Sequence, residues 1–176
     1  IGRNLRYGLL EYMGYTSWVK MGDEEPLETS STDFKRRTNY WLSYSKPLVF
    51  SWHLLHYLGE DTIDKIMHDY YENWKFKHPY PENYFSFFGK HSDKNLDWYI
   101  NDVFYKTGTV DYSVSIKDKK AMFINNGSLT LPFEAAYYDS KNNEISRQWY
   151  ENIDDVHIVS LPMGTNSIII DPDETL

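Results

Sequence analysis

The sequence predicts an α+β protein, because the spacing of its apolar residues changes character near Gly108. Before this glycine, apolar residues recur with the period of a helix; after it, they alternate with polar residues, which is the period of a strand. We therefore expect a helical domain over residues 1–108, packed on a small β-sandwich over residues 109–176. A chain of 176 residues is long enough for both.

The first strongly patterned helix is predicted to start at Pro47 and to end at Gly59. Proline fits the first turn of a helix, where its missing N–H would have no partner inside the helix. Glycine is common just past a helix end. The apolar residues between them have helical spacing and are expected to face the core: Leu48, Trp52, Leu55 and Leu58.

Three further helices are predicted before Gly108. One begins at Asp61, a good N-cap residue, one follows Pro81, and one covers about residues 96–105. In the first, the expected inward residues are Ile63, Ile66, Met67, Tyr70 and Trp74. In the other two, they are Tyr84, Phe85 and Phe88, and then Leu96, Ile100 and Val103.

The remainder of the chain predicts strands. Asn126-Gly127 is typical of a two-residue hairpin turn and is expected to join strands at residues 121–124 and 129–135. Pro132 would place the second of these at a sheet edge or in a bulge. A turn is expected at residues 139–143. The other strands are predicted at residues 110–116, 145–149, 156–161 and 167–170.

Composition excludes several classes of function. The 18 Lys and Arg against 26 Asp and Glu give a net charge of −8, and no basic stripe is present, so we expect no nucleic-acid partner. The absence of cysteine excludes disulfides and thiolate metal sites. No apolar run reaches the roughly 20 residues of a spanning helix, so we expect no membrane-spanning segment. Composition leaves the compartment open, and our expectation is a periplasmic or cell-surface location rather than a cytoplasmic one.

A series of motifs occurs in a fixed order along the chain. They are Tyr40-Trp41-Leu42-Ser43-Tyr44-Ser45-Lys46-Pro47, Leu58-Gly59-Glu60, Trp74-Lys75-Phe76-Lys77-His78-Pro79-Tyr80-Pro81, Leu96-Asp97-Trp98 and Thr107-Gly108-Thr109-Val110-Asp111-Tyr112. In this order and spacing they resemble the zinc aminopeptidases of the aminopeptidase N type, which are gluzincin metallopeptidases. The stretch they match follows the zinc-binding motif. The resemblance implies that the helical part is the latter half of a thermolysin-like catalytic domain. Leu131-Pro132-Phe133 and Ile170-Asp171-Pro172 look like parts of the adjoining β domain.

The resemblance also implies a catalytic role for Tyr44. In such peptidases, the tyrosine of a Tyr-x-Lys-Gly stretch points its hydroxyl at the substrate carbonyl and stabilises the negative charge that grows on the oxygen. The matching stretch here is Tyr44-Ser45-Lys46-Pro47, with proline at the glycine position. A phenol with a pKa of about 10 stays protonated at neutral pH and can donate. Tyr40, one helical turn earlier, is the alternative catalytic tyrosine, and a purely structural Tyr44 is the alternative from the tetrapeptide alone.

We predict no metal ligand and no cofactor-binding residue in this chain. A zincin site needs two histidines at i and i+4 with a glutamate between them. His53 and His56 are spaced i, i+3 with no acid between, which favours two ordinary helix-face imidazoles. The acidic side chains Glu24, Glu25 and Glu28 fall within residues 22–32, which are predicted to form an exposed, solvated loop. The zinc that the resemblance implies is expected to belong to the full-length enzyme.

The resemblance thus implies part of an aminopeptidase that removes N-terminal residues from peptides. Its partners would be a peptide substrate and the remainder of the parent polypeptide, and this chain alone is expected to be inactive. A second hypothesis is a non-catalytic binding or scaffold module. Aromatic residues make up 18% of the chain, and in that module they would contact peptide or glycan.

Overall fold

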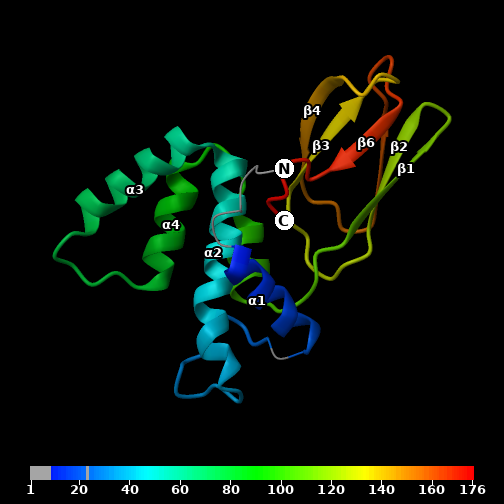
Figure 1. Ribbon diagram of the computed structural model, residues 1–176. Coiled ribbons are helices and arrows are strands. Elements are labelled where there is room, and N and C mark those ends of the chain that lie inside the picture. The colour runs from blue at the N-terminus through cyan, green and yellow to red at the C-terminus, as the bar shows by residue number, and fades with distance from the viewer. Residues whose placement is uncertain (1–8, 23) are drawn as a thin grey trace. The chain divides into compact units, whose positions relative to one another are not determined.

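The structure, a computed structural model, describes residues 9–22 and 24–176. The predicted helical domain includes residues 1–8 and the predicted loop includes residue 23, and these residues lie outside the described ones. The protein is a mixed α+β chain with two compact units, divided between Lys106 and Thr107. In the described part of the chain, the helices precede the strands, as Figure 1 shows. Among the described residues, no helix is both long enough and apolar enough to span a membrane.

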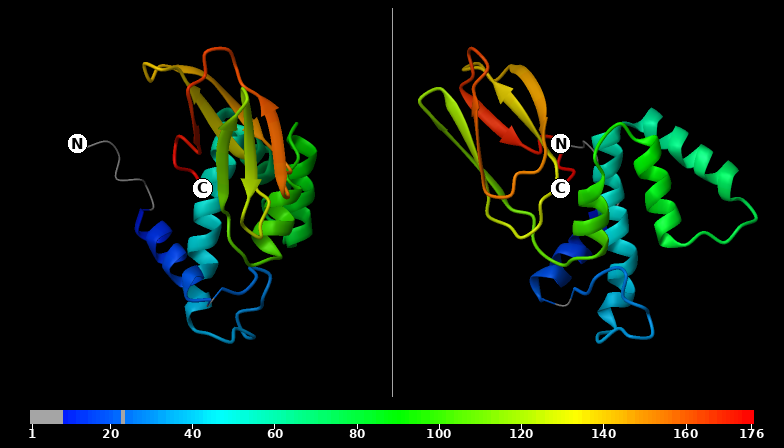
Figure 2. Two further views of the ribbon diagram at one scale, coloured as in Figure 1. Left: turned by 90° about the vertical axis from the view of Figure 1, so that its right-hand side faces the viewer. Right: turned by 180° about the vertical axis from the view of Figure 1, so that it is seen from behind.

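The helical unit is organised around one long helix, α2. In chain order its elements are α1 (Leu9–Lys20), α2 (Thr38–Leu58), α3 (Glu60–Trp74), α4 (Pro81–His91) and a short π-helical segment, η1 (Tyr99–Phe104). Helix α2 contacts α1, α3 and η1, while α4 packs on α3. The views in Figures 1 and 2 agree that α1 lies beside α2 and that α3 and α4 form a helical hairpin.

Helix α2 begins at Thr38, so the prediction that Pro47 starts a helix is wrong. Pro47 lies inside the helix, where it cannot donate to the carbonyl of Ser43 and where proline costs about 3 kcal/mol. Burial on one face offsets this cost, because each fully buried large apolar side chain contributes about 1.5–3 kcal/mol. The buried face is Asn39, Leu42, Lys46, Val49, Phe50, His53, Leu54 and Tyr57.

The predicted inward face of this helix is also wrong. Leu48 and Trp52 are exposed, and Leu55 and Leu58 are only half-buried. Nearly every face of α2 carries apolar or aromatic residues, so apolar spacing alone did not single out the inward face. The buried face was hidden because it includes Lys46 and His53, two residue types that sequence patterns place outside.

Gly59 ends α2, and α3 starts at the next residue. Its φ of 87° lies in the left-handed region, which lets the chain reverse direction between two helices without a loop. Asp61 is therefore not the N-cap of α3, because the helix already includes Glu60. On the predicted inward face of α3 only Ile66 is fully buried, and Met67 is exposed.

The predictions for the next two helical segments are largely confirmed. Helix α4 begins at Pro81 and buries Phe85 and Phe88. Its first turn is closed by the Tyr80 N–H, which donates to Asn83 Oδ1 at 2.8 Å. Between α4 and the end of the unit, Leu96 and Val103 are buried as predicted, and Ile100 is half-buried.

The second unit consists of two three-stranded antiparallel sheets. The strands are β1 (Tyr112–Lys117), β2 (Lys120–Asn125), β3 (Phe133–Tyr138), β4 (Glu144–Tyr150), β5 (Val156–Ser160) and β6 (Ser167–Ile170). The strand orders are β1-β2-β5 and β4-β3-β6. One core joins the two sheets, and its buried members are Ala121, Phe123, Phe133, Ala135, Tyr137, Tyr150 and Ile153.

The predicted hairpin at Asn126-Gly127 is wrong, because β2 and β3 belong to different sheets. The tight two-residue turn is Asp118-Lys119, which joins β1 to β2 and has positive φ at both positions. Gly127 instead lets two backbones approach closely. A Cβ there would lie 2.3 Å from the Thr109 carbonyl oxygen. Strand β3 is central in its sheet and starts after Pro132, so that proline marks neither an edge strand nor a bulge.

Candidate functional site

Tyr44 lies on the exposed side of α2. Its side chain is 64% exposed, and its ring packs edge-on against that of Tyr40, with the centroids 5.6 Å apart. Further exposed side chains follow at spacings of four residues, so they form a stripe along one side of the helix. We call it the aromatic stripe, and its members are Tyr40, Trp41, Tyr44, Leu48 and Trp52. The predicted catalytic tyrosine and its alternative therefore sit side by side on one accessible surface.

The Tyr44 hydroxyl is protonated at neutral pH. A hydrogen bond with Tyr40 raises the pKa of Tyr44 above its ordinary value of 10.0. A raised pKa keeps the phenol protonated through neutral pH and beyond. Tyr40 thus supports the donor form of its neighbour.

On the face of α2 opposite Tyr44, a buried ion pair connects the helix to the segment before it. Lys46 is fully buried, and its Nζ lies 2.7 Å from Glu24 Oε1, whose side chain is 5% exposed. The same ammonium donates to the Lys106 carbonyl oxygen at 2.8 Å. The Tyr15 hydroxyl donates to Glu24 Oε1 at 3.1 Å. We call these four groups the Lys46 clamp. It connects α1, the segment before α2, α2 itself and the chain after η1.

The electrostatics of the clamp follow from its burial. Burial lowers the pKa of Lys46, and the attraction of Glu24 acts in the opposite direction. Burial raises the pKa of Tyr15, and the Glu24 carboxylate raises it further. An ammonium without access to water is stable only if its protons are bound. Glu24 and the Lys106 carbonyl each bind one of them.

The prediction of a solvated loop over residues 22–32 is wrong for two of its three glutamates. Besides Glu24 in the clamp, Glu25 binds the segment to the start of α2: Lys35 N donates to Glu25 Oε1 at 3.1 Å, and Glu25 N donates to Asn39 Oδ1 at 3.1 Å. The third, Glu28, is exposed. Acidic composition hid these roles because their partners lie 9 to 22 residues away in sequence.

The two histidines that could have suggested a metal site lie in different surroundings. His53 is fully buried against the ring of Trp98, with the centroids 5.4 Å apart. His56 is exposed and packs on Trp52. Within residues 9–22 and 24–176, no group of three His, Asp or Glu side chains is arranged to hold a metal ion. The prediction that the zinc belongs elsewhere in the full-length enzyme stays a prediction.

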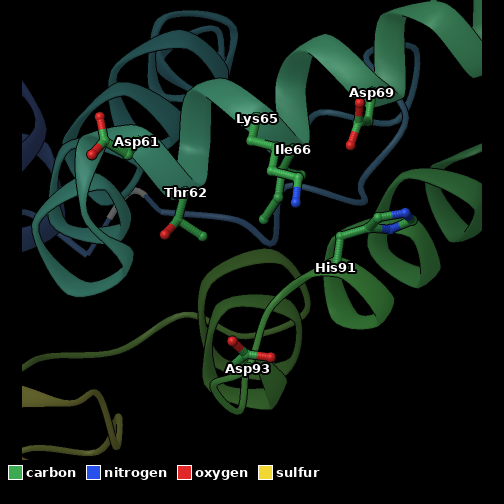
Figure 3. Close-up of a pocket in the computed structure, with 7 residues that line it drawn as sticks. All are labelled: Asp61, Thr62, Lys65, Ile66, Asp69, His91 and Asp93. Carbon is green, nitrogen blue, oxygen red and sulfur yellow. The ribbon is translucent and has the colours of Figure 1, made fainter.

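A separate cavity of about 300 Å³ lies between α3 and the end of α4. Figure 3 shows side chains from α3 on one side and His91 and Asp93 on the other. The lining combines three aspartates with a lysine and a histidine: Asp61, Thr62, Lys65, Ile66, Asp69, His91 and Asp93. No member of the aromatic stripe lines it. Sequence reasoning missed this cavity, which depends on how the α3–α4 hairpin closes.

Comparisons with known proteins support the fold. No protein-family model matches this chain, and no curated protein matches it. Among solved structures, the crystal structure of Legionella pneumophila aminopeptidase A in complex with aspartic acid is similar, with a TM-score of 0.56 at 10% sequence identity. The similarity covers 78% of this chain and 17% of that chain. At this identity the likeness shows that most of the chain shares its fold with a part of an aminopeptidase.

Proposed function

We propose that this chain is part of a zinc aminopeptidase in which Tyr44 donates a hydrogen bond to the carbonyl oxygen of the scissile peptide bond. The observation that carries the proposal is the position of Tyr44: an exposed phenol on α2, two residues before a lysine fixed on the opposite face. The order of the sequence motifs supports it. The fold shared with a part of an aminopeptidase supports it further.

The chemistry assigned to Tyr44 is electrostatic. When a nucleophile attacks the carbonyl carbon, negative charge develops on the oxygen, and a fixed hydroxyl stabilises that charge more in the transition state than in the ground state. The proposal places the zinc ligands in the remainder of the parent polypeptide, where the metal would act as a Lewis acid. The helical unit would correspond to the latter half of a thermolysin-like catalytic domain and the second unit to the adjoining β domain.

The test compares Tyr44→Phe with Tyr40→Phe in the zinc-loaded parent polypeptide, with aminoacyl-arylamide substrates. Loss of one oxyanion donor lowers kcat by about 10²–10³-fold, and KM should change little because the interaction forms in the transition state. Tyr40→Phe tests the alternative catalytic tyrosine, and Tyr71→Phe, at a similarly exposed tyrosine of α3, is the matched control that should keep the full kcat. A Tyr44→Phe enzyme with full kcat would refute the proposal. The 176-residue chain alone, mixed with zinc, is expected to show no turnover.

The aromatic stripe gives a specific reason to keep the binding-module hypothesis. Tyr40, Trp41 and Tyr44 expose apolar rings of the kind that stack on peptides or glycans. Tyr44→Phe separates the two functions, because it keeps the ring and removes only the hydroxyl. A binding module would keep its affinity in Tyr44→Phe and lose it in Trp41→Ala, whereas the peptidase would lose kcat in Tyr44→Phe.

A further inference from the structure

The position of Tyr44 on the surface is determined from the other side of the helix. Tyr44 and Lys46 are two residues apart, which separates their side chains by about 200° around an α-helix. A helix whose Lys46 points into the interior must therefore present Tyr44 outward. A rotation of α2 by one residue, about 100°, would carry Tyr44 off the exposed face.

Pro47 weakens the backbone of α2 at this point. Pro47 has no N–H, so the Ser43 carbonyl lacks its partner in the helix ladder. Two serines in the same turn also bond backward: Ser43 Oγ donates to the Tyr40 carbonyl at 2.8 Å and Ser45 Oγ donates to the Trp41 carbonyl at 3.2 Å. Such bonds compete with regular helix geometry and often bend helices. Local structure alone therefore does not fix the direction of Tyr44.

The Lys46 clamp supplies the missing constraint. It joins Lys46 to Glu24 at 2.7 Å and to the Lys106 carbonyl at 2.8 Å. Tyr15 of α1 holds the same carboxylate. The ion pair adds a directional constraint to the packing of the other buried residues of α2, because a buried ammonium must keep both partners.

We propose that Lys46 is the positioning residue of Tyr44: the clamp between Lys46, Glu24 and the Lys106 carbonyl sets the rotation of α2 and so aims the Tyr44 hydroxyl. This inference rests on the proposed function for its catalytic consequence. The geometric part concerns the chain itself and does not depend on peptidase activity.

The geometric part is tested by ¹⁹F NMR of the chain labelled with 3-fluorotyrosine. The Tyr44 line is assigned by its absence from Tyr44→Phe. The Tyr71 line, from an equally exposed tyrosine on α3 (61% against 64%), is assigned in the same way and serves as the internal control. The double variant Lys46→Met/Glu24→Gln removes the clamp without leaving a buried charge unpaired. It should shift or broaden the Tyr44 line and leave the Tyr71 line in place.

An unchanged Tyr44 line in the double variant would overturn the proposal. Lys90→Met, at an exposed lysine of α4, should move neither line. If the double variant does not fold, Tyr15→Phe is measured instead, because it removes one hydrogen bond that holds Glu24 and leaves the Lys46–Glu24 ion pair in place. A smaller shift in the same direction is then expected, and no shift would overturn the proposal.

The catalytic part is tested in the parent polypeptide by combining the clamp variant with Tyr44→Phe. Misplacement of a catalytic group by about 1 Å lowers the rate by about 10²-fold, so Lys46→Met/Glu24→Gln should lower kcat by about that factor with KM little changed. In a Tyr44→Phe background it should cause no further loss, since the group it positions is absent. Independent, multiplicative losses would show that Lys46 acts by another route. If Tyr44→Phe alone keeps the full rate, the proposed function fails, and the NMR result still decides the geometric part.

Discussion

Removing Lys46 alone should destabilise the helical unit more than removing Lys46 and Glu24 together. Lys46→Met leaves the Glu24 carboxylate, 5% exposed, with only Tyr15 among its clamp partners. Breaking a buried pair from one side costs about 3–5 kcal/mol. The Tyr15 hydroxyl still donates to the carboxylate, so we expect the lower part of that range, about 3 kcal/mol.

The double variant Lys46→Met/Glu24→Gln removes both charges. Replacing a buried pair by neutral side chains of similar size is often neutral or stabilising by about 1–4 kcal/mol. Against this, the Lys106 carbonyl loses its donor from Lys46, which costs about 1–3 kcal/mol if that oxygen stays dry. The two effects nearly cancel. The double variant should therefore be more stable than Lys46→Met by about 2–3 kcal/mol.

Urea denaturation followed by tryptophan fluorescence measures this difference. Five of the six tryptophans lie before Lys106, so the signal reports the helical unit. With a slope of about 1–3 kcal/mol/M, a loss of 3 kcal/mol lowers the midpoint by about 1–3 M. Lys90→Met should shift the free energy of unfolding by less than about 0.5 kcal/mol, as expected for an exposed site. Equal midpoints for Lys46→Met and the double variant would refute a desolvated ion pair.

Two further predictions concern pH and glycine. Burial raises the pKa values of Tyr15 and Tyr99. The free energy of unfolding that the two buried phenols contribute is thus complete below about pH 10. It falls as the pH rises further, by about 1.4 kcal/mol per pH unit for each tyrosine. Urea midpoints that stay constant from pH 9 to 11 would contradict this prediction. Gly127→Ala should destabilise the second unit by about 1–3 kcal/mol, because its Cβ would meet the Thr109 carbonyl. Gly89→Ala, with open space around its Cβ, should stabilise α4 by about 0.5–1 kcal/mol. Circular dichroism melts in which both variants coincide with the wild type would contradict these two predictions.

Some elements were predictable because a few neighbouring residues determine them. Pro81 starts α4 and Phe85 and Phe88 fill its inner face, as the spacing indicated. Gly59 ends α2 because the chain needs a positive φ there. The pattern after Gly108 predicted five of the six strands of the second unit to within about two residues, whereas β3 starts at Phe133, four residues later than predicted. In each case the deciding interaction spans only a few residues.

Strand pairing was not predictable from the same local signals. Asn126-Gly127 has the composition of a hairpin turn, yet its neighbours pair with a distant segment: Asn126 N donates to the Asp111 carbonyl at 2.7 Å, and Ser128 N donates to the Thr109 carbonyl at 2.9 Å. The turn that does join paired strands, Asp118-Lys119, lacks the usual glycine. Hydrogen bonds to distant segments of the chain, rather than local composition, therefore determine which of the two sites forms the hairpin turn.

For the candidate site, sequence identified the residue that faces solvent and missed the residues that hold it. Tyr44 was found through a motif. The catalytic role of Tyr44 stays a prediction. The signal for Lys46 was present, since it lies four residues after Leu42 and seven before His53 on one helical face. A lysine on that face needs a buried acid, but Glu24 is 22 residues away in an acidic segment. Nothing local singles out Glu24 from its neighbours.

Pro47 explains why the helix needs the Lys46 clamp in the turn that carries Tyr44. Where the resembling peptidases carry glycine, the chain has a residue that deletes a backbone hydrogen bond in the turn that carries Tyr44. A helix weakened there would let its exposed tyrosine vary in direction, unless side-chain contacts on the buried face replaced the lost constraint. Lys46 lies in that turn and binds two separate segments of the chain. Pro47→Gly in the Lys46→Met/Glu24→Gln background should therefore not restore the Tyr44 NMR line, because glycine returns the N–H but adds backbone freedom and does not replace the clamp.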